Sequence, residues 1–303
     1  MSEAEESIRC VLRGDRSWAL VHGSVVDYAH LFQGNARADL VYGDLPYCTG
    51  QDWLYEGRVA YSDKYASPEA WAVSMADLVT SLRDGICGGG QMIVHVDWRY
   101  SHLLRAEIAR RIEPRASGLR VGSPRMPYDL VNEIVWRYRR MPARSNALQS
   151  VHDTLYVWRR RGGEPIFQVL YEPLAESTRK QWGTKKQKAI VKDGQRVKSS
   201  TGEEESPGVP MGDVWDLSIV APQAKERTGY PTQKPVSLGL RLVDSFSRMG
   251  SLVVDVTCGS ATMGEAALRR GRRFIGFDTS AVAVEVARAR LSAVETSIAE
   301  GRG

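Results

Sequence analysis

The sequence lacks any long hydrophobic run. No apolar stretch approaches the roughly 18 residues that a helix needs to cross a bilayer. The first six residues, Met-Ser-Glu-Ala-Glu-Glu, are acidic and contain no apolar segment typical of a secretory signal. We therefore expect a cytoplasmic protein with no membrane anchor.

Cysteine and histidine are scarce, with four and five residues among 303. The cysteines (Cys10, Cys48, Cys87 and Cys258) are scattered and show no spacing typical of zinc ligands. The histidines form no metal-binding helix pattern either. We expect reduced thiols and no metal site.

The remaining composition is ordinary, with 43% hydrophobic and 25% charged residues, which is typical of a globular protein. The length predicts two domains, or one large domain with an insertion. The net charge of +5 is mild, so it favours nucleic acid as a partner only if the basic residues cluster.

Residues 252–262, Leu-Val-Val-Asp-Val-Thr-Cys-Gly-Ser-Ala-Thr, form the stretch around which the chain is organised. The apolar run at 252–254 is too short for a helix and suits a buried parallel strand that ends at Asp255. The small residues 257–262 let the backbone approach a ligand closely, and a helical pattern begins at Met263. The order is therefore strand, tight turn, helix.

A second apolar strand, 274–277, ends in Asp278, which follows Asp255 by 23 residues. An acid at the tip of the next strand is placed to bind the two hydroxyls of a ribose. The Gly-x-Gly-x-x-Gly fingerprint is missing, which argues against the pyrophosphate of a dinucleotide. S-adenosylmethionine, which has a ribose but no phosphate, fits better. The alternative is a plain strand–turn–helix unit without a ligand, since many α/β proteins contain one.

A more specific motif, Asp44-Leu45-Pro46-Tyr47, directly follows the apolar strand expected at 38–42. A plain turn is the simplest interpretation, because Asp-x-Pro is common after strands. The motif also places a carboxylate and an aromatic ring at the carboxyl edge of a parallel sheet, where ligands of open α/β folds bind. Proline fixes the backbone there, and the tyrosine offers a flat face to a base.

Together these motifs resemble the beta-class DNA amino-methyltransferases, which methylate adenine N6 or cytosine N4. The family pattern is Asp-Pro-Pro-Tyr or Ser-Pro-Pro-Tyr early in the chain, then Thr-Gln-Lys-Pro and Asp-Pro-Phe-x-Gly-Ser-Gly-Thr late. This chain departs from it with Leu45 at the first proline and with Val256, Thr257, Cys258 and Ala261 in the late motif. The flank 44–53 also resembles modification subunits of Type III restriction systems.

The resemblance implies a Rossmann-like α/β methyltransferase fold, a mostly parallel seven-stranded sheet with one antiparallel strand. It implies a catalytic domain in two parts, 1–165 and 216–303, of which the second binds S-adenosylmethionine. Residues 166–215, dense in Lys and Arg, then form a small target-recognition insertion. The alternative is a solvated surface insertion, and the polar stretch 199–208 is expected to be a loop.

The resemblance also assigns roles to individual residues. The catalytic set is Asp44, Leu45, Pro46 and Tyr47, in which the Asp44 carboxylate and Leu45 carbonyl accept from the target amino group while Tyr47 stacks on the base. The cofactor set is Ser24, Thr232, Gln233, Lys234, Pro235, Asp255, Thr257, Cys258, Gly259, Ser260, Ala261, Thr262 and Asp278. The DNA-binding set is Arg139, Arg140, Arg144, Arg179, Lys180, Lys185, Lys186 and Lys188.

The rest of the pattern predicts the elements between the motifs. A helix is expected at 68–82, a glycine turn at Gly88–Gly90 and a strand at 92–96. His95 and Asp97 have the residue types of a catalytic pair, but the resemblance favours packing near the sheet edge.

The function implied is site-specific methylation of adenine N6 in double-stranded DNA, with the base flipped out of the helix. Asp at the head of the first motif favours adenine, because the resemblance associates Ser with most cytosine N4 enzymes. Cytosine N4 methylation and a catalytically weak paralogue that binds DNA or cofactor remain the alternatives. A homodimer, a restriction partner and a bacterial, archaeal or phage origin are compatible with the resemblance.

Overall fold

The computed structural model describes residues 2–34, 37–113, 128–139 and 146–301. The chain separates into two compact units, which are described here one at a time. The first comprises Met1–Phe167 and Asp213–Gly303, and the second comprises Gln168–Gly212. The second unit overlaps the insertion that the sequence predicts at 166–215. Within the described ranges, none of the helices is long and apolar enough to span a membrane.

The first unit is built on a sheet that has eight strands within the described residues, in the order β1-β14-β13-β2-β5-β7-β6-β12. Only β7 of these runs antiparallel to its neighbours, β5 and β6. The expected fold is therefore confirmed, with an eighth strand, β12, added parallel to β6 at the edge. The strands are β1 (Trp18–His22), β2 (Ala38–Asp44), β5 (Ile86–Asp97), β6 (Tyr128–Arg137), β7 (His152–Arg160), β12 (Val214–Asp216), β13 (Leu252–Asp255) and β14 (Arg273–Asp278).

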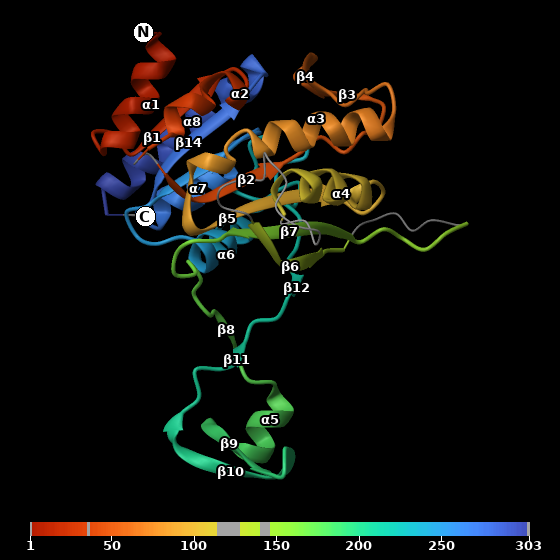
Figure 1. Cartoon of the computed structure of the whole chain (residues 1–303), viewed down its shortest axis with the longest axis vertical. Coiled ribbons are helices and arrows are strands. Elements are labelled where there is room, and N and C mark those ends of the chain that lie inside the picture. The colour runs from red at the N-terminus through yellow and green to blue at the C-terminus, as the bar shows by residue number, and fades with distance from the viewer. Residues whose placement is uncertain (1, 35–36, 114–127, 140–145, 302–303) are drawn as a thin grey trace, which may run out of the picture. The chain divides into compact units, whose positions relative to one another are not determined.

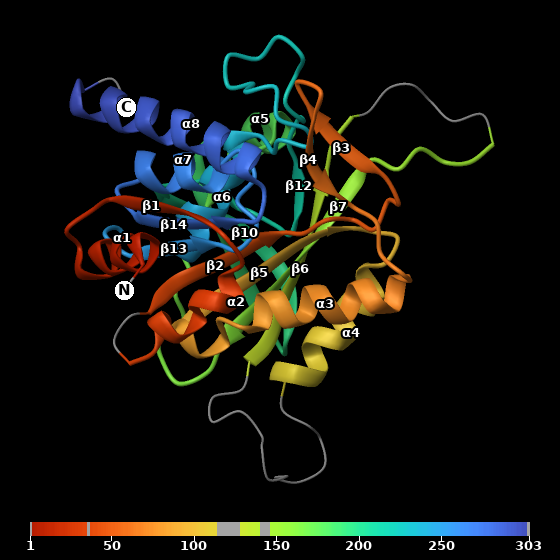
Figure 2. The same ribbon diagram turned by 90° about the horizontal axis from the view of Figure 1, so that it is seen from above.

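Helices cover both faces of this sheet (Figure 2). On one side lie α2 and α3 with α4, and on the other lie α6 and α7 with α8. Their start sites follow from capping residues: Ser67 caps α3 directly before Pro68, and Ser280 caps α8. The helices are α1 (Glu3–Arg13), α2 (Val25–Tyr28), α3 (Pro68–Thr80), α4 (Ser101–Ile112), α6 (Val236–Phe246), α7 (Thr262–Arg269) and α8 (Ala281–Ala299), with 3-10 turns η1 (Ala29–Phe32) and η2 (Arg83–Gly85).

The pairing of β13 with β2 creates a switch point in the sheet. From β13 the chain continues to β14 on one side, and from β2 it continues to β5 on the other. Crossovers that leave in opposite directions open a crevice at the carboxyl ends of the two strands, where open α/β sheets bind ligands. Asp255 and Asp44 end these two strands, so both motifs meet at the crevice.

The glycine run Gly88–Gly90 is not a turn, contrary to the sequence prediction. It lies within β5, which extends from Ile86 to Asp97. A methyl group added at Gly88 or Gly89 would collide with the carbonyl oxygens of Gly162 and Glu164. The glycines therefore serve close backbone approach rather than chain reversal.

A second, smaller sheet flanks the crevice. It is a hairpin of β3 (Asp52–Tyr55) and β4 (Arg58–Ser62), joined through Glu56 and Gly57 at positive φ of 48° and 77°. Two successive positive φ angles match the right-handed twist of hairpin strands.

The second unit is held together by another hairpin, β9 (Lys185–Lys192) with β10 (Gln195–Glu205), beside the short helix α5 (Glu176–Trp182) (Figure 1). Asp193 and Gly194 form its turn at φ of 50° and 76°. The loop expected at 199–208 is wrong for most of its length, because residues up to Glu205 continue β10. The strands β8 (Tyr171–Glu172) and β11 (Val209–Pro210) pair at the ends of the unit.

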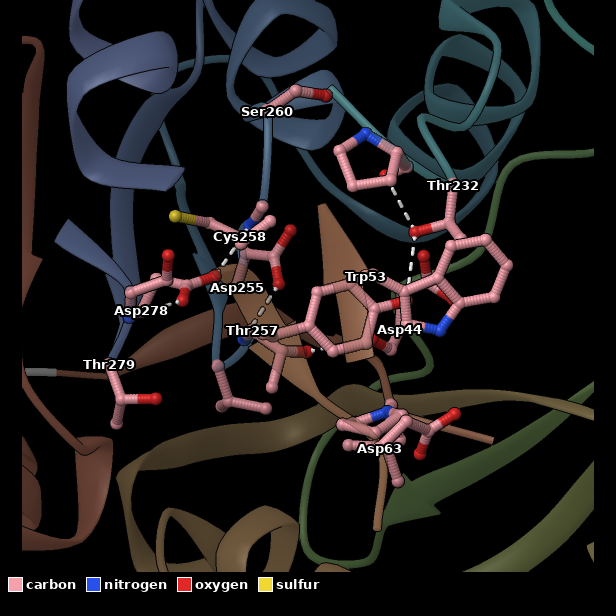
Figure 3. Close-up of a pocket in the computed structure, with 18 of the residues that line it drawn as sticks. Asp44, Trp53, Asp63, Thr232, Asp255, Thr257, Cys258, Ser260, Asp278 and Thr279 are labelled. Carbon is pink, nitrogen blue, oxygen red and sulfur yellow. Dashed lines mark hydrogen bonds between the residues drawn. The ribbon is translucent and has the colours of Figure 1, made fainter. Parts of the chain in front are cut away.

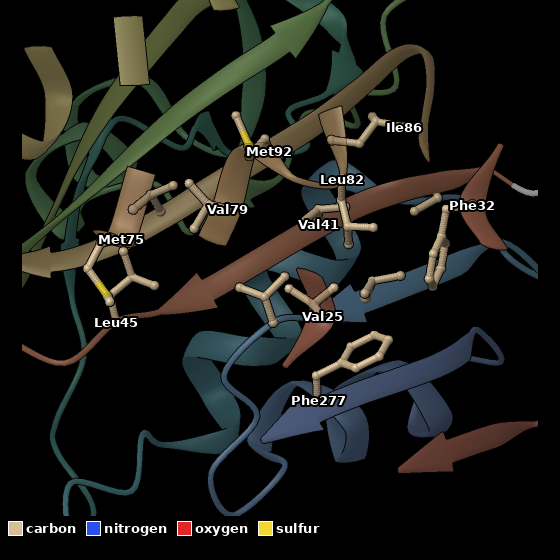
Figure 4. Packing of buried hydrophobic residues seen from close by; sticks show 14 of the residues in the cluster. Val25, Phe32, Val41, Leu45, Met75, Val79, Leu82, Ile86, Met92 and Phe277 are labelled. Atoms are coloured by element: carbon tan, nitrogen blue, oxygen red, sulfur yellow. The ribbon is translucent and has the colours of Figure 1, made fainter. Parts of the chain in front are cut away.

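Leu45, which stands where the family pattern has proline, is part of the main hydrophobic core. Its side chain is 2% exposed and clusters with Met75 and Val79 of α3 (Figure 4). Burial of an apolar side chain anchors the segment that follows β2. The leucine therefore fixes the loop by packing, whereas a proline would fix it by restricting φ.

Replacing this anchor should destabilise the protein. We expect Leu45→Ala to lower the free energy of unfolding by about 2–5 kcal/mol, the usual cost of deleting a buried leucine side chain. Leu54→Ala is the matched control, because Leu54 lies on the hairpin and is 58% exposed. Chemical denaturation of both variants tests this, and equal losses would show that Leu45 is not an anchor.

Candidate active site

A cavity of about 900 Å³ lies at the carboxyl edge of the sheet, within the first unit. Its walls come from the ends of β2 and β14, the turn after β13, the segment before α6 and the β3–β4 hairpin. This volume is in the range typical of sites for organic ligands. Figure 3 shows Asp44, Asp255 and Asp278 around it, with Trp53 and Thr232 on the hairpin side.

The turn after β13 is shaped by its own polar groups. Asp255 accepts a hydrogen bond from the Thr257 backbone N–H at 3.1 Å. Ala261 is fully buried, adopts a left-handed φ of 57° and starts α7. A non-glycine residue in this region stores strain of order 1 kcal/mol or more. The turn thus keeps its form although alanine replaces the second glycine of the family pattern.

Asp278 binds the same turn through backbone amides. Its two carboxylate oxygens accept from Gly259 N–H and Ser280 N–H, each at 2.9 Å. Burial raises the pKa of Asp278, which these two hydrogen bonds partly offset. Asp278 also lines the cavity, and each oxygen of a carboxylate can accept a further hydrogen bond. The carboxylate is therefore fixed in place and still able to accept from a ligand hydroxyl.

Asp44, the first residue of the first motif, is contacted by Tyr47, by Lys234 and by Thr257 in the turn after β13. Its Oδ2 is 2.6 Å from Lys234 Nζ, and its Oδ1 accepts from the Tyr47 hydroxyl at 3.1 Å. The Asp44 carbonyl accepts from Thr257 Oγ1 at 3.1 Å, which ties the first motif to the turn after β13. Trp71 of α3 also stabilises the motif, because its Nε1–H donates a hydrogen bond to the Pro46 carbonyl oxygen at 2.8 Å.

Behind Asp44 lies a buried network that the sequence did not identify. The Tyr47 hydroxyl is also 3.1 Å from Asp153 Oδ2, and Asp153 bonds His95 Nε2 at 3.2 Å and the Tyr138 hydroxyl at 2.9 Å. Burial alone would raise the pKa of Asp153, but the hydrogen bond and charge of His95, with Lys234 and Tyr138, lower it. Asp153 therefore stays ionised and holds the Tyr47 ring by its hydroxyl.

His95 does not pair with Asp97, although the two residues are near each other in sequence. His95 is fully buried and its Nδ1 bonds the Tyr42 hydroxyl at 2.8 Å. Asp97 instead pairs with Arg99, whose Nε is 2.6 Å away. The partner of His95 is Asp153 on β7, 58 residues further along the chain, so no spacing along β5 reveals it.

Asp63 is a second residue that the sequence analysis missed. It is 1% exposed and accepts from the backbone N–H groups of Tyr47, Cys48 and Thr49 at 3.2, 2.8 and 3.0 Å. The Thr49 hydroxyl adds a fourth hydrogen bond at 2.7 Å. A carboxylate in a nest of backbone donors is strongly stabilised. Asp63, which directly follows β4, therefore fixes the backbone that carries Tyr47.

The hairpin supplies an aromatic wall that was also not predicted. Trp53 and Tyr61 stack with ring centroids 6.2 Å apart and an interplanar angle of 21°. The Tyr61 hydroxyl is 3.2 Å from Thr232 Oγ1, which links the hairpin to the segment before α6. Trp53 Nε1 is buried and has no hydrogen-bond partner among the described residues.

The segment before α6 is held by its own side chains. Thr232 has a positive φ of 58°, and Gln233 accepts from Thr228 N–H at 2.8 Å and donates to the Glu226 carbonyl at 2.7 Å. Thr262 Oγ1 donates to the Lys234 carbonyl at 2.9 Å. Pro235 precedes α6 as its N-cap residue and does not line the cavity.

Arg290 of α8 supports the turn from behind, and no sequence signal marked it. Its side chain is buried, pairs with Glu265 and donates to the Ser260 carbonyl at 3.2 Å and Thr262 Oγ1 at 3.1 Å.

Among the described residues, no cluster of three or more His, Cys, Asp or Glu side chains is arranged to hold a metal ion.

Most residues of the predicted catalytic and cofactor sets line the one cavity. The exceptions are Ala261 and Pro235, which shape the backbone beside it. Ser24 lines the cavity and also caps α2 through Val26 N–H. The lining members of the sets are Ser24, Asp44, Leu45, Pro46, Tyr47, Thr232, Gln233, Lys234, Asp255, Thr257, Cys258, Gly259, Ser260, Thr262 and Asp278.

The described members of the predicted DNA-binding set are either ion-paired lysines or exposed arginines. Within the second unit, Lys180 pairs with Glu176, Lys185 with Glu205 and Lys186 with Glu204, at 2.7, 2.5 and 3.4 Å. Arg139 in the first unit and Arg179 in the second are exposed. Arg140, Arg144 and the side chain of Lys188 lie outside the described part of the chain.

Comparison with known proteins agrees with these motifs. Residues 38–289 match the sequence model of the family described as DNA methylase, over most of the chain. The chain therefore belongs to the DNA methylase family.

It is 38% identical over 91 residues to Type II methyltransferase M2.DpnII of Streptococcus pneumoniae, covering 30% of this chain and 34% of the relative. It is 35% identical over 89 residues to DNA adenine methyltransferase YhdJ of Escherichia coli K12, covering 29% and 30%. These matches span about a third of the curated relatives' length.

Two solved structures share the fold at low identity. The M1.HpyAVI–SAM complex has a TM-score of 0.56 and 15% identity, covering 90% of this chain and 98% of its own. The PvuII DNA methyltransferase, described as cytosine-N4-specific, has a TM-score of 0.60 and 12% identity, covering 94% of each chain. They confirm the methyltransferase fold of this family member. The resemblance to Type III modification subunits stays a prediction.

The position of Asp63 gives a testable result. Asp63→Ala removes four hydrogen bonds to one buried carboxylate and should lower the free energy of unfolding by on the order of 3 kcal/mol. Asp52→Ala is the matched control on the same hairpin, because Asp52 makes an exposed pair with Lys64 at 2.6 Å. Denaturant titration of both variants measures their free energies of unfolding. If Asp63→Ala lowers this free energy no more than Asp52→Ala does, Asp63 does not have the proposed role.

Asp255 should make stability depend on pH. Burial raises the pKa of Asp255 well above its ordinary value. The folded protein then keeps a proton that the unfolded chain has lost, so stability falls as pH rises above about 4 through the raised pKa. Asp255→Asn removes this effect while retaining an acceptor for Thr257 N–H. We expect the variant to melt above the wild type at pH 8, by a margin that shrinks at pH 5. Exposed Asp27→Asn is the control, and a constant margin would contradict the assignment.

Proposed function

We propose that the protein transfers a methyl group from S-adenosylmethionine to adenine N6 in DNA. The observation that carries this proposal is the meeting of Asp44 and Tyr47 with the turn after β13 in one cavity. One motif offers acceptors and a ring to a base, and the other offers a small-residue turn and a carboxylate to a ribose. A methyl transferase needs both ligands side by side, with the reacting atoms in contact.

The residues present fit the cofactor. Asp278 at the end of β14 offers acceptors for two ribose hydroxyls, and Gly259 leaves room for close backbone approach. Asp255 and residues 257–260 would hold the methionine part, which carries an ammonium. When bound, this cofactor supplies an electrophilic methyl group. The buried carboxylates would attract its cationic groups, and this attraction would offset the desolvation of the carboxylates.

Asp44 would act on the target amino group. The lone pair of an exocyclic amine is delocalised into the ring, so the amine is a poor nucleophile. A carboxylate that accepts from one amino proton and the Leu45 carbonyl that accepts from the other would favour a more tetrahedral nitrogen. The carboxylate also stabilises the positive charge that develops on nitrogen during attack. The Tyr47 ring, held by Asp63 and Asp153, would stack on the base.

Adenine is favoured over cytosine on two grounds. Asp44 heads the first motif, and one of the curated relatives, YhdJ of Escherichia coli K12, is described as a DNA adenine methyltransferase. Cytosine N4 methylation is the alternative, because a structural neighbour is described as cytosine-N4-specific. Both bases present an amino group beside a ring nitrogen, so the chemistry at Asp44 is the same.

DNA binding would involve the exposed arginines and the second unit. Several of its lysines form ion pairs, so the electrostatic contribution to phosphate binding is smaller than the sequence alone suggests. The base must leave the duplex to reach the cavity. We also propose that the protein is cytoplasmic and of bacterial, archaeal or phage origin, and the bacterial relatives support the first of these origins. A homodimer and a restriction partner are compatible with the proposal, which depends on neither.

The test is methylation of DNA followed by digestion to nucleosides and mass spectrometry. We expect N6-methyladenine from the wild type and at least a hundredfold slower methylation by Asp44→Ala, since a preorganised charge is lost. Asp44→Ala should still bind S-adenosylmethionine in a calorimetric titration, whereas Asp278→Ala should bind it about tenfold or more weakly.

The outcomes separate the alternatives. N4-methylcytosine as the sole product would overturn the choice of base and leave the amine chemistry intact. Cofactor binding without any methylated nucleoside would favour the weak paralogue, for which the substitutions Leu45 and Ala261 are the sequence argument. Unchanged methylation by Asp44→Ala would refute the mechanism.

A further inference from the structure

Lys234 differs from the other predicted cofactor-binding residues, because its ammonium contacts the catalytic carboxylate. Nζ lies 2.6 Å from Asp44 Oδ2 and over the Tyr47 ring, 5.1 Å from its centroid. The lysine side chain is 12% exposed and that of Asp44 is 20% exposed. The cation is therefore held in a partly desolvated site, against the two groups assigned above to the target base.

The contacts of the ammonium are those that an exocyclic amino group would make. Both groups can donate N–H hydrogen bonds to a carboxylate, and in the proposed complex the amino group would lie next to the tyrosine ring as the ammonium does. The amino group would resemble the Lys234 ammonium more closely during methyl transfer, because the attacking nitrogen becomes positively charged. On the basis of the function proposed above, we propose that Lys234 is a tethered occupant of the target-amine position, which the arriving base displaces.

The electrostatics favour displacement over shared occupancy. Asp44 Oδ1 already accepts from the Tyr47 hydroxyl and faces His95 Nδ1 at 3.6 Å. If Lys234 stayed on Oδ2, its charge would cancel the field of the carboxylate at the reacting nitrogen. A neighbouring cation would also oppose the positive charge that develops there. The productive complex therefore requires the ammonium to leave Asp44.

The backbone around Lys234 allows this exchange by side-chain rotation alone. The Lys234 carbonyl is held by Thr262 Oγ1 at 2.9 Å, and the preceding Gln233 is held by Thr228 and Glu226. These bonds fix the start of the side chain, while its four methylene groups remain rotatable. Rotamer changes of this kind are fast compared with typical turnover.

The acidic groups at this strand edge explain why a lysine is useful there. Asp44 shares the crevice with Asp255, and the charge of Asp44 contributes to the raised pKa of Asp255, after the larger effect of burial. Without a counter-charge, two carboxylates at one strand edge would repel each other in a poorly solvated place. Lys234 neutralises Asp44 until an amine takes its place.

The test compares Lys234→Met with Lys234→Arg. Methionine keeps a flexible, unbranched side chain without the charge, whereas arginine keeps a competing cation. Initial rates are measured with radiolabelled cofactor at saturation and varied unmethylated bacterial genomic DNA. We expect about fivefold lower KM for DNA with Lys234→Met, because the base no longer displaces an ion pair, and no decrease with Lys234→Arg.

Cofactor affinity is the second measurement. Calorimetric titration should give the same dissociation constant for S-adenosylmethionine in Lys234→Met and the wild type, within about twofold. Weaker cofactor binding with an unchanged KM for DNA would overturn the proposal and assign Lys234 to the cofactor. A raised KM for DNA would overturn it by showing that Lys234 holds the base. Thermal unfolding of each variant verifies that it is folded.

A binding measurement that does not depend on methyl transfer separates the displacement of Lys234 from the proposed methyltransferase function. The ¹⁵N resonance of the Lys234 ammonium, assigned by its loss in Lys234→Met, should shift when saturating unmethylated DNA is added to the wild type. A resonance that DNA does not move would refute displacement. A wild type that transfers no methyl group would instead refute the proposed function.

Discussion

The parallel pairing of β13 with β2 is the constraint on which the site depends. Val253, Val254 and Asp255 pair with Leu40, Val41 and Tyr42, which joins two segments more than two hundred residues apart. This register brings both strand ends to one edge, so that the Thr257 hydroxyl reaches the Asp44 carbonyl. Because side chains alternate along a strand, a slip of one residue would turn Asp255 and Asp44 away from the same crevice.

The price of this arrangement is a concentration of acidic side chains where the strands end. Burial raises the pKa of both Asp255 and Asp278, so the folded protein loses stability as pH rises and these two groups ionise. Asp153 differs because His95 offsets its burial, and its pKa is lowered. A ligand with positive charge removes the cost at Asp255, which couples binding to stability.

The sequence predicts those features of the structure that depend on residues close together in the chain. The strands and capped helices follow from apolar runs and from residues such as Ser67 and Pro68, and the two motifs were found because each lies in one short segment. Asp63 and Asp153 could not be found this way, because their partners in the first motif lie 14 to 16 and 106 residues away. Gly88–Gly90 was misread because a close backbone approach and a turn favour the same residue.

The departures from the family motif show what the loop after β2 actually requires. Leu45 replaces a proline, yet its side chain is buried and its N–H donates to the His95 carbonyl at 3.2 Å, a bond that proline cannot make. Asp63 and Trp71 hold the loop from two further sides. Since these contacts fix the backbone independently, the rigid ring at position 45 is dispensable. Asp44 and Tyr47 line the cavity themselves, so the proposed function requires their side chains and not only the backbone conformation of the loop.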